Sequence, residues 1–220
     1  MIKAFVDIEK LFQDIGLRLE SDIHIFLIGG AVLLHQGLKP ATKDIDAIVD
    51  GKRDFDALEL CLRRMKFRAV ITPLEYGRMD LSQIFVRDDF RIDLFDRTVC
   101  RGFALSESMK KRSNEVISLD KIKVSVCSNE DIFVFKTLTE REGDLDDCIA
   151  LAQGGLDWDA VLAEIKGQIG VKRRPVWITW IGERLDLLVE RGLNIPMMPE
   201  IDRLRKDFFD DFEQRHKSAG

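Results

Sequence analysis

The sequence predicts an α+β protein, in which a small mixed β-sheet with flanking helices is followed by a helical C-terminal part. Up to about residue 128, short runs of β-branched and aromatic residues alternate with runs of helical period. After that point nearly every stretch has a helical period. We therefore expect an α/β core over residues 1–128 and a helical region over residues 129–220.

Composition limits the class of protein. The 220 residues are 45% hydrophobic and 33% charged, which is too apolar for disorder and too charged for a membrane protein. The longest apolar run, Ile25–Leu34, is shorter than the ~18 residues that span a bilayer, and the charged N-terminus lacks the apolar stretch of a signal peptide. The four widely spaced cysteines indicate a reduced cytoplasmic protein, and we expect no membrane partner. The net charge of −5 argues against a protein that coats nucleic acid non-specifically but leaves a local basic groove open.

The first part of the chain alternates between the two periods. A helical pattern over residues 2–20 precedes a strand at Ile23–Ile28, which ends at a Gly-Gly pair. A short helix over Ala31–Gln36, a strand over Asp44–Val49 and a helix over Phe55–Met65 follow. Further strands are predicted at 67–72, 81–87, 91–95, 115–119 and 122–127, with hairpin turns at 88–89 and 120–121.

The second part is predicted to be helical throughout. Residues 129–153 have a helical pattern, with a break expected at Gly143. Three more helices are expected over 157–169, 175–191 and 199–216. Pro175 and Pro199 suit the first turns of the last two, because a proline there sacrifices no helical hydrogen bond.

Two aspartates, Asp44 and Asp46, flank Ile45 in a predicted strand. Residues i and i+2 of a strand share a face, so both carboxylates lie on one side while Ile45 points into the core. Neighbouring carboxylates repel, and a divalent cation bound through oxygen ligands removes that repulsion. We expect Mg²⁺ or Mn²⁺ there, with Asp93 of a later strand as the third ligand. The alternative is a solvated strand face.

The pair Gly29–Gly30 stands directly after a strand and at the start of a helix. Glycines at such a point allow backbone N–H groups to approach a ligand closely, and a helix N-terminus favours phosphate. The alternative is an ordinary tight turn from strand to helix. Taken with the aspartates, the pair predicts a phosphate-binding turn beside a metal site.

The order of these features resembles the nucleotidyltransferase superfamily that includes DNA polymerase β. It runs strand, Gly-Gly, short helix, Asp-Ile-Asp on a strand, then a third aspartate on a later strand. More narrowly, the stretch Phe26–Asp50 is similar to the AbiEii-like minimal nucleotidyltransferases, in which a basic residue and a threonine precede the two acids. The residues that the resemblance implies for nucleotide binding are Gly29, Gly30, Lys39 and Thr42.

A second motif agrees with the narrower family. Its pattern has a lysine on a helix, then a basic residue and a stretch with two aspartates. The matching residues are Lys136, Arg141, Asp144 and Asp147. Gly143 departs from the pattern, because the family usually has a second basic residue there. The resemblance implies that residues 129–153 complete the active site, with Lys136 binding nucleotide phosphates and Asp144 also catalytic. The alternatives are a surface lysine and an aspartate that caps the following helix.

The resemblance implies a metal-dependent enzyme that transfers a nucleoside monophosphate from an NTP to an acceptor hydroxyl or phosphate and releases pyrophosphate. Asp44, Asp46 and Asp93 would be catalytic and hold the metal, since two metal ions can clamp the attacking and leaving oxygens. The expected acceptors are tRNA, other RNA or a protein. The alternatives are a non-catalytic nucleotide-binding or partner-binding module and a toxin with an antitoxin partner.

Two basic stretches fit an anionic acceptor. Residues 97–123 hold seven basic and three acidic residues, and Lys172–Arg174 is a second cluster. We expect both to face a cleft between the sheet and the C-terminal helices, where RNA phosphates would bind. The alternative for Lys172–Arg174 is a solvated linker.

Overall fold

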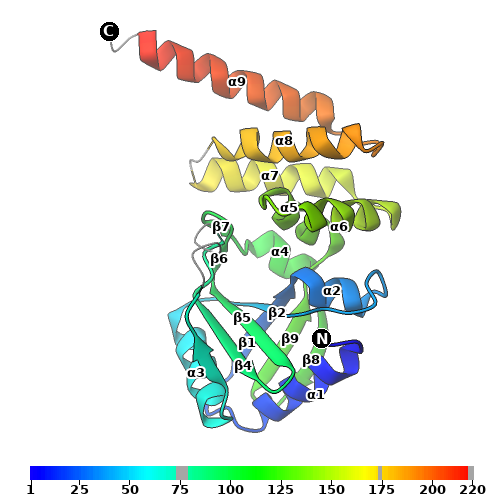
Figure 1. Ribbon diagram of the computed structural model, residues 1–220. Helices are drawn as coiled ribbons and strands as arrows, with labels where there is room; N and C mark the ends of the chain where they lie inside the picture. Colours follow the sequence, from blue (N-terminus) through cyan, green and yellow to red (C-terminus); the bar gives the residue numbers. More distant parts are fainter. Residues whose placement is uncertain (73–78, 173–174, 218–220) are drawn as a thin grey trace. The chain divides into compact units, whose positions relative to one another are not determined.

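The computed structural model describes residues 1–72, 79–172 and 175–217. The chain divides into two compact units, Met1–Ser128 and Asn129–Gly220, and each is described by itself. The first unit contains a mixed sheet with flanking helices, and the second is helical (Figure 1). This confirms the predicted α+β class.

The sheet of the first unit has seven strands in the order β3-β4-β5-β2-β1-β9-β8. At its centre, β2 pairs with β5 in parallel and with β1 antiparallel, and β1 pairs with β9 in parallel. The strands are β1 (Ile23–Ile28), β2 (Ile45–Val49), β3 (Arg68–Val70), β4 (Gln83–Arg87), β5 (Phe90–Asp96), β8 (Asn114–Leu119) and β9 (Ile122–Val126). The apolar runs of the sequence thus become the buried central strands, because a strand covered on both faces needs apolar residues at nearly every position.

Both predicted hairpins are present. Strands β4 and β5 pair antiparallel around Asp88 and Asp89, and Asp88 takes a positive φ of 53°. Aspartate tolerates that conformation better than most residues, which explains a tight turn without glycine. Strands β8 and β9 form the second hairpin.

The helices of the first unit are α1 (Phe5–Gly16), α2 (Gly29–His35), α3 (Lys52–Arg64) and α4 (Glu107–Arg112). Helix α1 begins three residues later than predicted, because Ile2 instead forms a β-bridge with Thr42. The buried face of α1 (Ile8, Leu11, Phe12 and Ile15) has the helical spacing of its sequence. Helix α2 begins at Gly29 rather than at Ala31.

The segment after β5 was not predicted. It forms a small hairpin from β6 (Thr98–Val99) and β7 (Phe103–Ala104), followed by α4. Its turn has positive φ angles at Cys100, Arg101 and Gly102, and only the glycine is a residue type that signals such a turn. The Ser106 hydroxyl accepts a hydrogen bond from the Met109 amide at 3.1 Å and caps α4.

The second unit consists of α5 (Asn129–Thr137), α6 (Glu142–Gln153), α7 (Trp158–Lys172), α8 (Trp177–Glu190) and α9 (Met198–Lys217). Helix α5 is buried from Asp131 to Thr137 and contacts α6, α7 and α8. The predicted break at Gly143 is wrong. The helix ends at Thr137, and Gly143 lies in the first turn of α6.

Of the two prolines predicted in first turns of helices, one lies in such a turn and the other does not. Pro199 lies in the first turn of α9, as predicted. Pro175 instead precedes α8 by two residues, in a turn where its carbonyl accepts from the Ile178 amide at 3.1 Å. Within the described ranges, no helix is both long enough and apolar enough to cross a membrane.

Candidate active site

Two of the three predicted metal-binding acids, Asp46 and Asp93, lie on adjacent strands of the sheet. Strand β2 begins at Ile45 and not at the predicted Asp44, which directly precedes it. Asp46 of β2 is in register with Asp93 of the parallel strand β5, and Asp44 stands two residues before Asp46. Paired residues of neighbouring strands share a face, so Asp46 and Asp93 lie on the same side of the sheet. The intervening Ile45 is fully buried. The predicted metal site requires all three carboxylates to lie on this face, and the strand register establishes it for Asp46 and Asp93.

Gly29 brings its backbone directly against Asp46. It has a φ of +64°, and a Cβ built on it would lie 2.1 Å from Oδ2 of Asp46. Strand pairing accounts for this contact, because Ile28 at the end of β1 is in register with Asp46. Only glycine satisfies both the left-handed backbone and the lack of space. The Gly-Gly turn and the acidic pair therefore form one constellation.

Thr42 supports the turn that precedes the acids. Its buried hydroxyl donates to the carbonyl oxygen of Asp44 at 2.9 Å, and its backbone pairs with Ile2. A Cβ on Gly30 would lie 2.5 Å from Oγ1 of Thr42, so the turn packs tightly here too. Thr42 thus holds the backbone of Asp44 in place. Lys39 is half-buried in the loop after α2, where its amide donates to the Leu33 carbonyl at 3.2 Å.

Asp93 forms a bidentate ion pair with Arg91. The Nε atom of Arg91 lies 2.6 Å from Oδ1 and Nη2 lies 2.7 Å from Oδ2, while Asp93 is only 2% exposed. A buried carboxylate needs such compensation, because an unpaired charge is costly away from water. Throughout the ranges that the structure describes, no three acidic, histidine or cysteine side chains gather closely enough to hold a metal ion. The shared metal site thus remains a prediction.

The donor set nevertheless fits a divalent cation. Mg²⁺ is usually held by one or two carboxylates together with substrate phosphates. Asp46 of β2 and Asp44, which directly precedes that strand, are both half-buried, and Asp46 lies next to the Gly29 turn. These two residues match that pattern, and Asp93 lies beside them with its carboxylate bound to Arg91.

In the second unit, the predicted residues Lys136 and Asp144 form a buried ionic cluster. The Nζ atom of Lys136 lies 2.7 Å from Oδ1 of Asp144 and 2.6 Å from Oδ2 of Asp147. Asp144 also accepts hydrogen bonds from Thr139 at 2.5 Å and from Arg141 at 2.8 Å. With its side chain 6% exposed, Lys136 is not a surface lysine. No side chain caps α6 at Arg141, so Asp144 is not an N-cap.

The charges of this cluster reinforce one another. Burial alone would raise the pKa of Asp144, but Lys136 and Arg141 lower that pKa to about 2. Burial likewise opposes the charge of Lys136, yet Asp144 and Asp147 raise its pKa above the usual value. Both groups are therefore ionised at neutral pH. The cluster connects the end of α5 to the start of α6, which explains why the helix breaks between them rather than at Gly143.

The predicted basic stretch over residues 97–123 is partly neutralised by acids. Arg97 and Lys110 both pair with Asp50, and Lys123 pairs with Glu115 at 2.8 Å. Burial would raise the pKa of Asp50, but hydrogen bonds and charge from Lys110 and Arg97 lower it. The Lys172–Arg174 cluster falls outside what the structure describes, since residues 173–174 and the side chain of Lys172 are not included.

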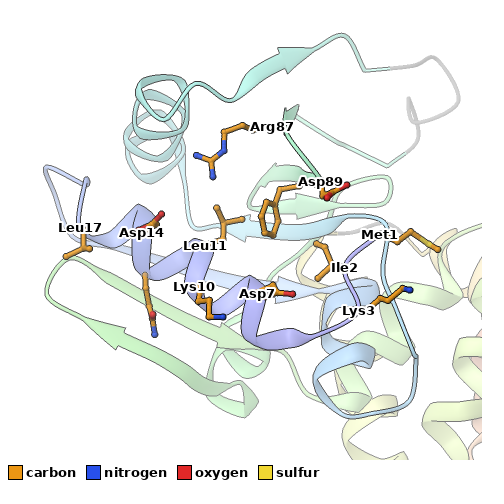
Figure 2. A pocket seen from close by; sticks show the side chains of 12 residues that line it. Met1, Ile2, Lys3, Asp7, Lys10, Leu11, Asp14, Leu17, Arg87 and Asp89 are labelled. Atoms are coloured by element: carbon orange, nitrogen blue, oxygen red, sulfur yellow. The ribbon is translucent and has the colours of Figure 1, made fainter.

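A groove of about 760 Å³ lies elsewhere in the first unit, between α1 and the β4–β5 turn. Figure 2 shows Lys3, Lys10 and Arg87 around it, together with Asp7 and Asp89. This mixture of charges selects neither an anion nor a cation, and none of the predicted site residues lines the groove. We assign it no role in the site.

Arg91 and Thr139 are the site residues that sequence reasoning missed. Arg91 stands two positions before Asp93 in the same strand, so strand alternation places both on one face. The spacing of Arg91 and Asp93 in the sequence therefore indicates an ion pair between them. Thr139 lies in the break between α5 and α6, and its role depends on a fold of the chain that no local pattern indicates.

Comparison with known proteins assigns the chain to a family. A profile described as "Nucleotidyltransferase of unknown function (DUF6036)" matches residues 3–169, which is most of the sequence. No protein with a curated description has a similar sequence.

Solved structures share the fold. A solution structure of the antibiotic-resistance factor ANT(2'')-Ia is 14% identical, with a TM-score of 0.51, and the alignment covers 80% of this chain and 94% of that one. A crystal structure of ANT(2'')-Ia in complex with adenylyl-2''-tobramycin is 13% identical, with a TM-score of 0.48 and coverage of 74% and 95%. At these identities the likeness concerns the fold.

Proposed function

Because this chain belongs to a family of nucleotidyltransferases whose function is unknown, we propose that it transfers a nucleoside monophosphate from an NTP to an acceptor. The acceptor is a hydroxyl or a phosphate group, and pyrophosphate is released. One observation supports this above all others. The strand register sets Asp46 beside Asp93, Asp44 directly precedes strand β2, and the Gly29 turn contacts Asp46.

The acids and the glycines of the first unit have separate roles in the proposed reaction. Asp44, Asp46 and Asp93 would hold Mg²⁺ or Mn²⁺, and the backbone amides of Gly29 and Gly30 would bind the triphosphate. When bound, the metal supplies charge stabilisation for the phosphoryl oxygens. Asp93 accepts the proton of the attacking hydroxyl, whose oxygen bonds to the α-phosphorus as the bond to the β-phosphate oxygen breaks.

The other predicted nucleotide-binding residues have supporting roles. Thr42 keeps Asp44 in position through its bond to the Asp44 carbonyl. Lys39, in the loop after α2, adds positive charge near the phosphates.

We further propose that residues 129–153 complete the site. The matched family region extends to residue 169 and so includes this segment. Lys136 and Asp144 form a fixed ionic cluster, and Arg141 is its exposed member, with 53% of the side chain open to solvent. Lys136 provides positive potential toward the nucleotide phosphates, and Asp144 holds that charge in place.

The narrower identity also remains a proposal. The motifs support an AbiEii-like enzyme in the cytoplasm that modifies tRNA, other RNA or a protein, with the toxin role and its antitoxin partner as one form of that function. All four cysteines are buried, as expected in a reducing compartment. One of the structural neighbours is an antibiotic-resistance factor, so small hydroxylated molecules are included among the acceptors tested.

The test is a labelling assay that measures transfer of the α-phosphate to each of several acceptors. Each NTP labelled at the α-phosphate is incubated with Mg²⁺ and with tRNA, total RNA, protein or an aminoglycoside in turn. We expect label on one acceptor class and none with Asp46→Asn. If no acceptor is labelled while NTP still binds to the wild type, the chain is a non-catalytic nucleotide-binding module.

A further inference from the structure

We propose that the Arg91 guanidinium neutralises Asp93 until a divalent cation binds. The ion pair thereby sets the affinity of the site for its metal. This inference rests on the proposed function, because it concerns the same three acids. It adds a positioning residue that acts through Asp93.

The geometry gives the two partners unequal freedom. Both carboxylate oxygens of Asp93 receive an N–H group of Arg91, at 2.6 Å and 2.7 Å. The Asp93 side chain is 4% exposed, whereas that of Arg91 is 29% exposed. Asp93 is held inside the sheet between β4 and β2. The guanidinium lies at the solvent side of the pair, so it is the partner that moves when another cation arrives.

The electrostatics make Arg91 and a metal ion competitors. A carboxylate with both oxygens bound by a guanidinium fork has fewer lone pairs left for a metal. Two cations held at one carboxylate also repel each other, most strongly where little water screens them. In the absence of metal, Arg91 compensates the buried negative charge of Asp93. Without Arg91, that charge would be buried without a partner of opposite sign.

The experiment measures Mn²⁺ binding to the full-length chain by electron paramagnetic resonance of the free ion. The variants are Arg91→Gln and, as a matched control, Arg68→Gln, which changes an exposed arginine on strand β3 of the same sheet. Arg91 competes with the metal for both oxygens of Asp93, so we expect Arg91→Gln to bind Mn²⁺ about tenfold more tightly or better. Arg68→Gln should match the wild type.

Thermal unfolding provides a second readout. Without metal, Arg91→Gln should melt below the wild type, because Asp93 loses its counter-charge. Mg²⁺ should then raise its melting temperature by more than it raises that of the wild type. If Arg91→Gln does not fold, Arg91→Lys replaces it. Lysine keeps the charge but not the fork geometry, and its Mn²⁺ affinity should exceed that of the wild type.

The outcomes separate the inference from the function on which it rests. If the wild type and the Arg91 variants bind Mn²⁺ with equal affinity, and Asp46→Asn weakens that binding, the metal site stands and Arg91 is only a permanent structural partner. That result overturns the inference alone. If neither the wild type nor any variant binds Mn²⁺, the proposed metal site fails and the inference fails with it.

Discussion

The backbone of Gly29 and the carboxylate of Asp46 constrain each other, and this contact is the most specific residue-level feature of the candidate site. Position 29 has a left-handed backbone, and a Cβ there would lie 2.1 Å from Oδ2 of Asp46, so any other residue would strain the backbone and displace that carboxylate. An ordinary strand-to-helix turn needs the backbone conformation but not the contact with an acid. The chain offers a matched position for separating these two requirements, because Gly37 also has a positive φ of 73° and no atom near its Cβ position.

We predict that Gly29→Ala and Gly37→Ala share one effect and differ in another. Both should lower the free energy of unfolding by about 1–2 kcal/mol, since each places an L-residue in the left-handed region. Only Gly29→Ala should displace the Asp46 carboxylate and abolish the stabilisation by Mg²⁺ with NTP. Chemical denaturation with and without these ligands measures both quantities. Identical behaviour of the two variants would mean that the Gly29 turn does not serve the acidic site.

Asp46→Asn should separate folding from metal binding. Replacing one of two neighbouring carboxylates relieves their repulsion, so the melting temperature without metal should hold or rise. The increase caused by Mg²⁺ with NTP should shrink, because the site loses a ligand. Calorimetry under both conditions measures the effect. A variant that unfolds in the absence of metal would show that Asp46 has a structural role instead.

At the scale of elements, the cluster around Lys136 joins α5 to α6. Its carboxylate Asp144 is ionised well below the usual range, with a pKa of about 2 against an ordinary 3.8. A carboxyl group whose pKa is lowered by folding contributes stability above its unfolded pKa. That contribution is lost as the pH falls through the folded value, so the relevant window runs from about pH 4 to about pH 2.

We therefore predict an acid-sensitive part of the stability that belongs to Asp144. The shift corresponds to about 2 kcal/mol. Asp144→Asn should remove roughly that amount at neutral pH and flatten the stability curve in this window. Asp146→Asn, on the exposed side of the same helix, is the control and should leave the slope unchanged. Urea denaturation across the pH series gives the values. Equal slopes for the wild type and Asp144→Asn would contradict the assignment.

The elements also show how far sequence reasoning extends. Alternating and apolar runs located the central strands, and the spacing of Asp44, Asp46 and Asp93 anticipated acids on neighbouring strands because strand periodicity is local. The helix break was misplaced because Gly143 is tolerated in a first turn, while the real break depends on the cluster of Lys136 and Asp144. The β6–β7 hairpin escaped prediction because its turn also needs positive φ at Cys100 and Arg101, and Gly102 alone is a weak signal.

For the whole molecule, the region matched by the family profile does not end where the first unit ends. The match covers residues 3–169, whereas the first unit ends at Ser128. Helices α5 and α6, with Lys136 and Asp144, therefore belong to the region that defines the family, and α8 and α9 lie beyond it. The region that defines the family therefore extends beyond the first unit, and the last two helices lie outside it.

The central claim, nucleotidyl transfer, is tested most directly by following the two ends of the triphosphate. An NTP labelled at the α-phosphate and the same NTP labelled at the γ-phosphate are incubated with the full chain, Mg²⁺ and the acceptor panel. The account predicts that the α-label becomes bound to an acceptor, that the γ-label leaves as pyrophosphate, and that Asp46→Asn does neither. Transfer of the γ-label to the acceptor, or release of the γ-label as free phosphate with no α-label transferred, would contradict it.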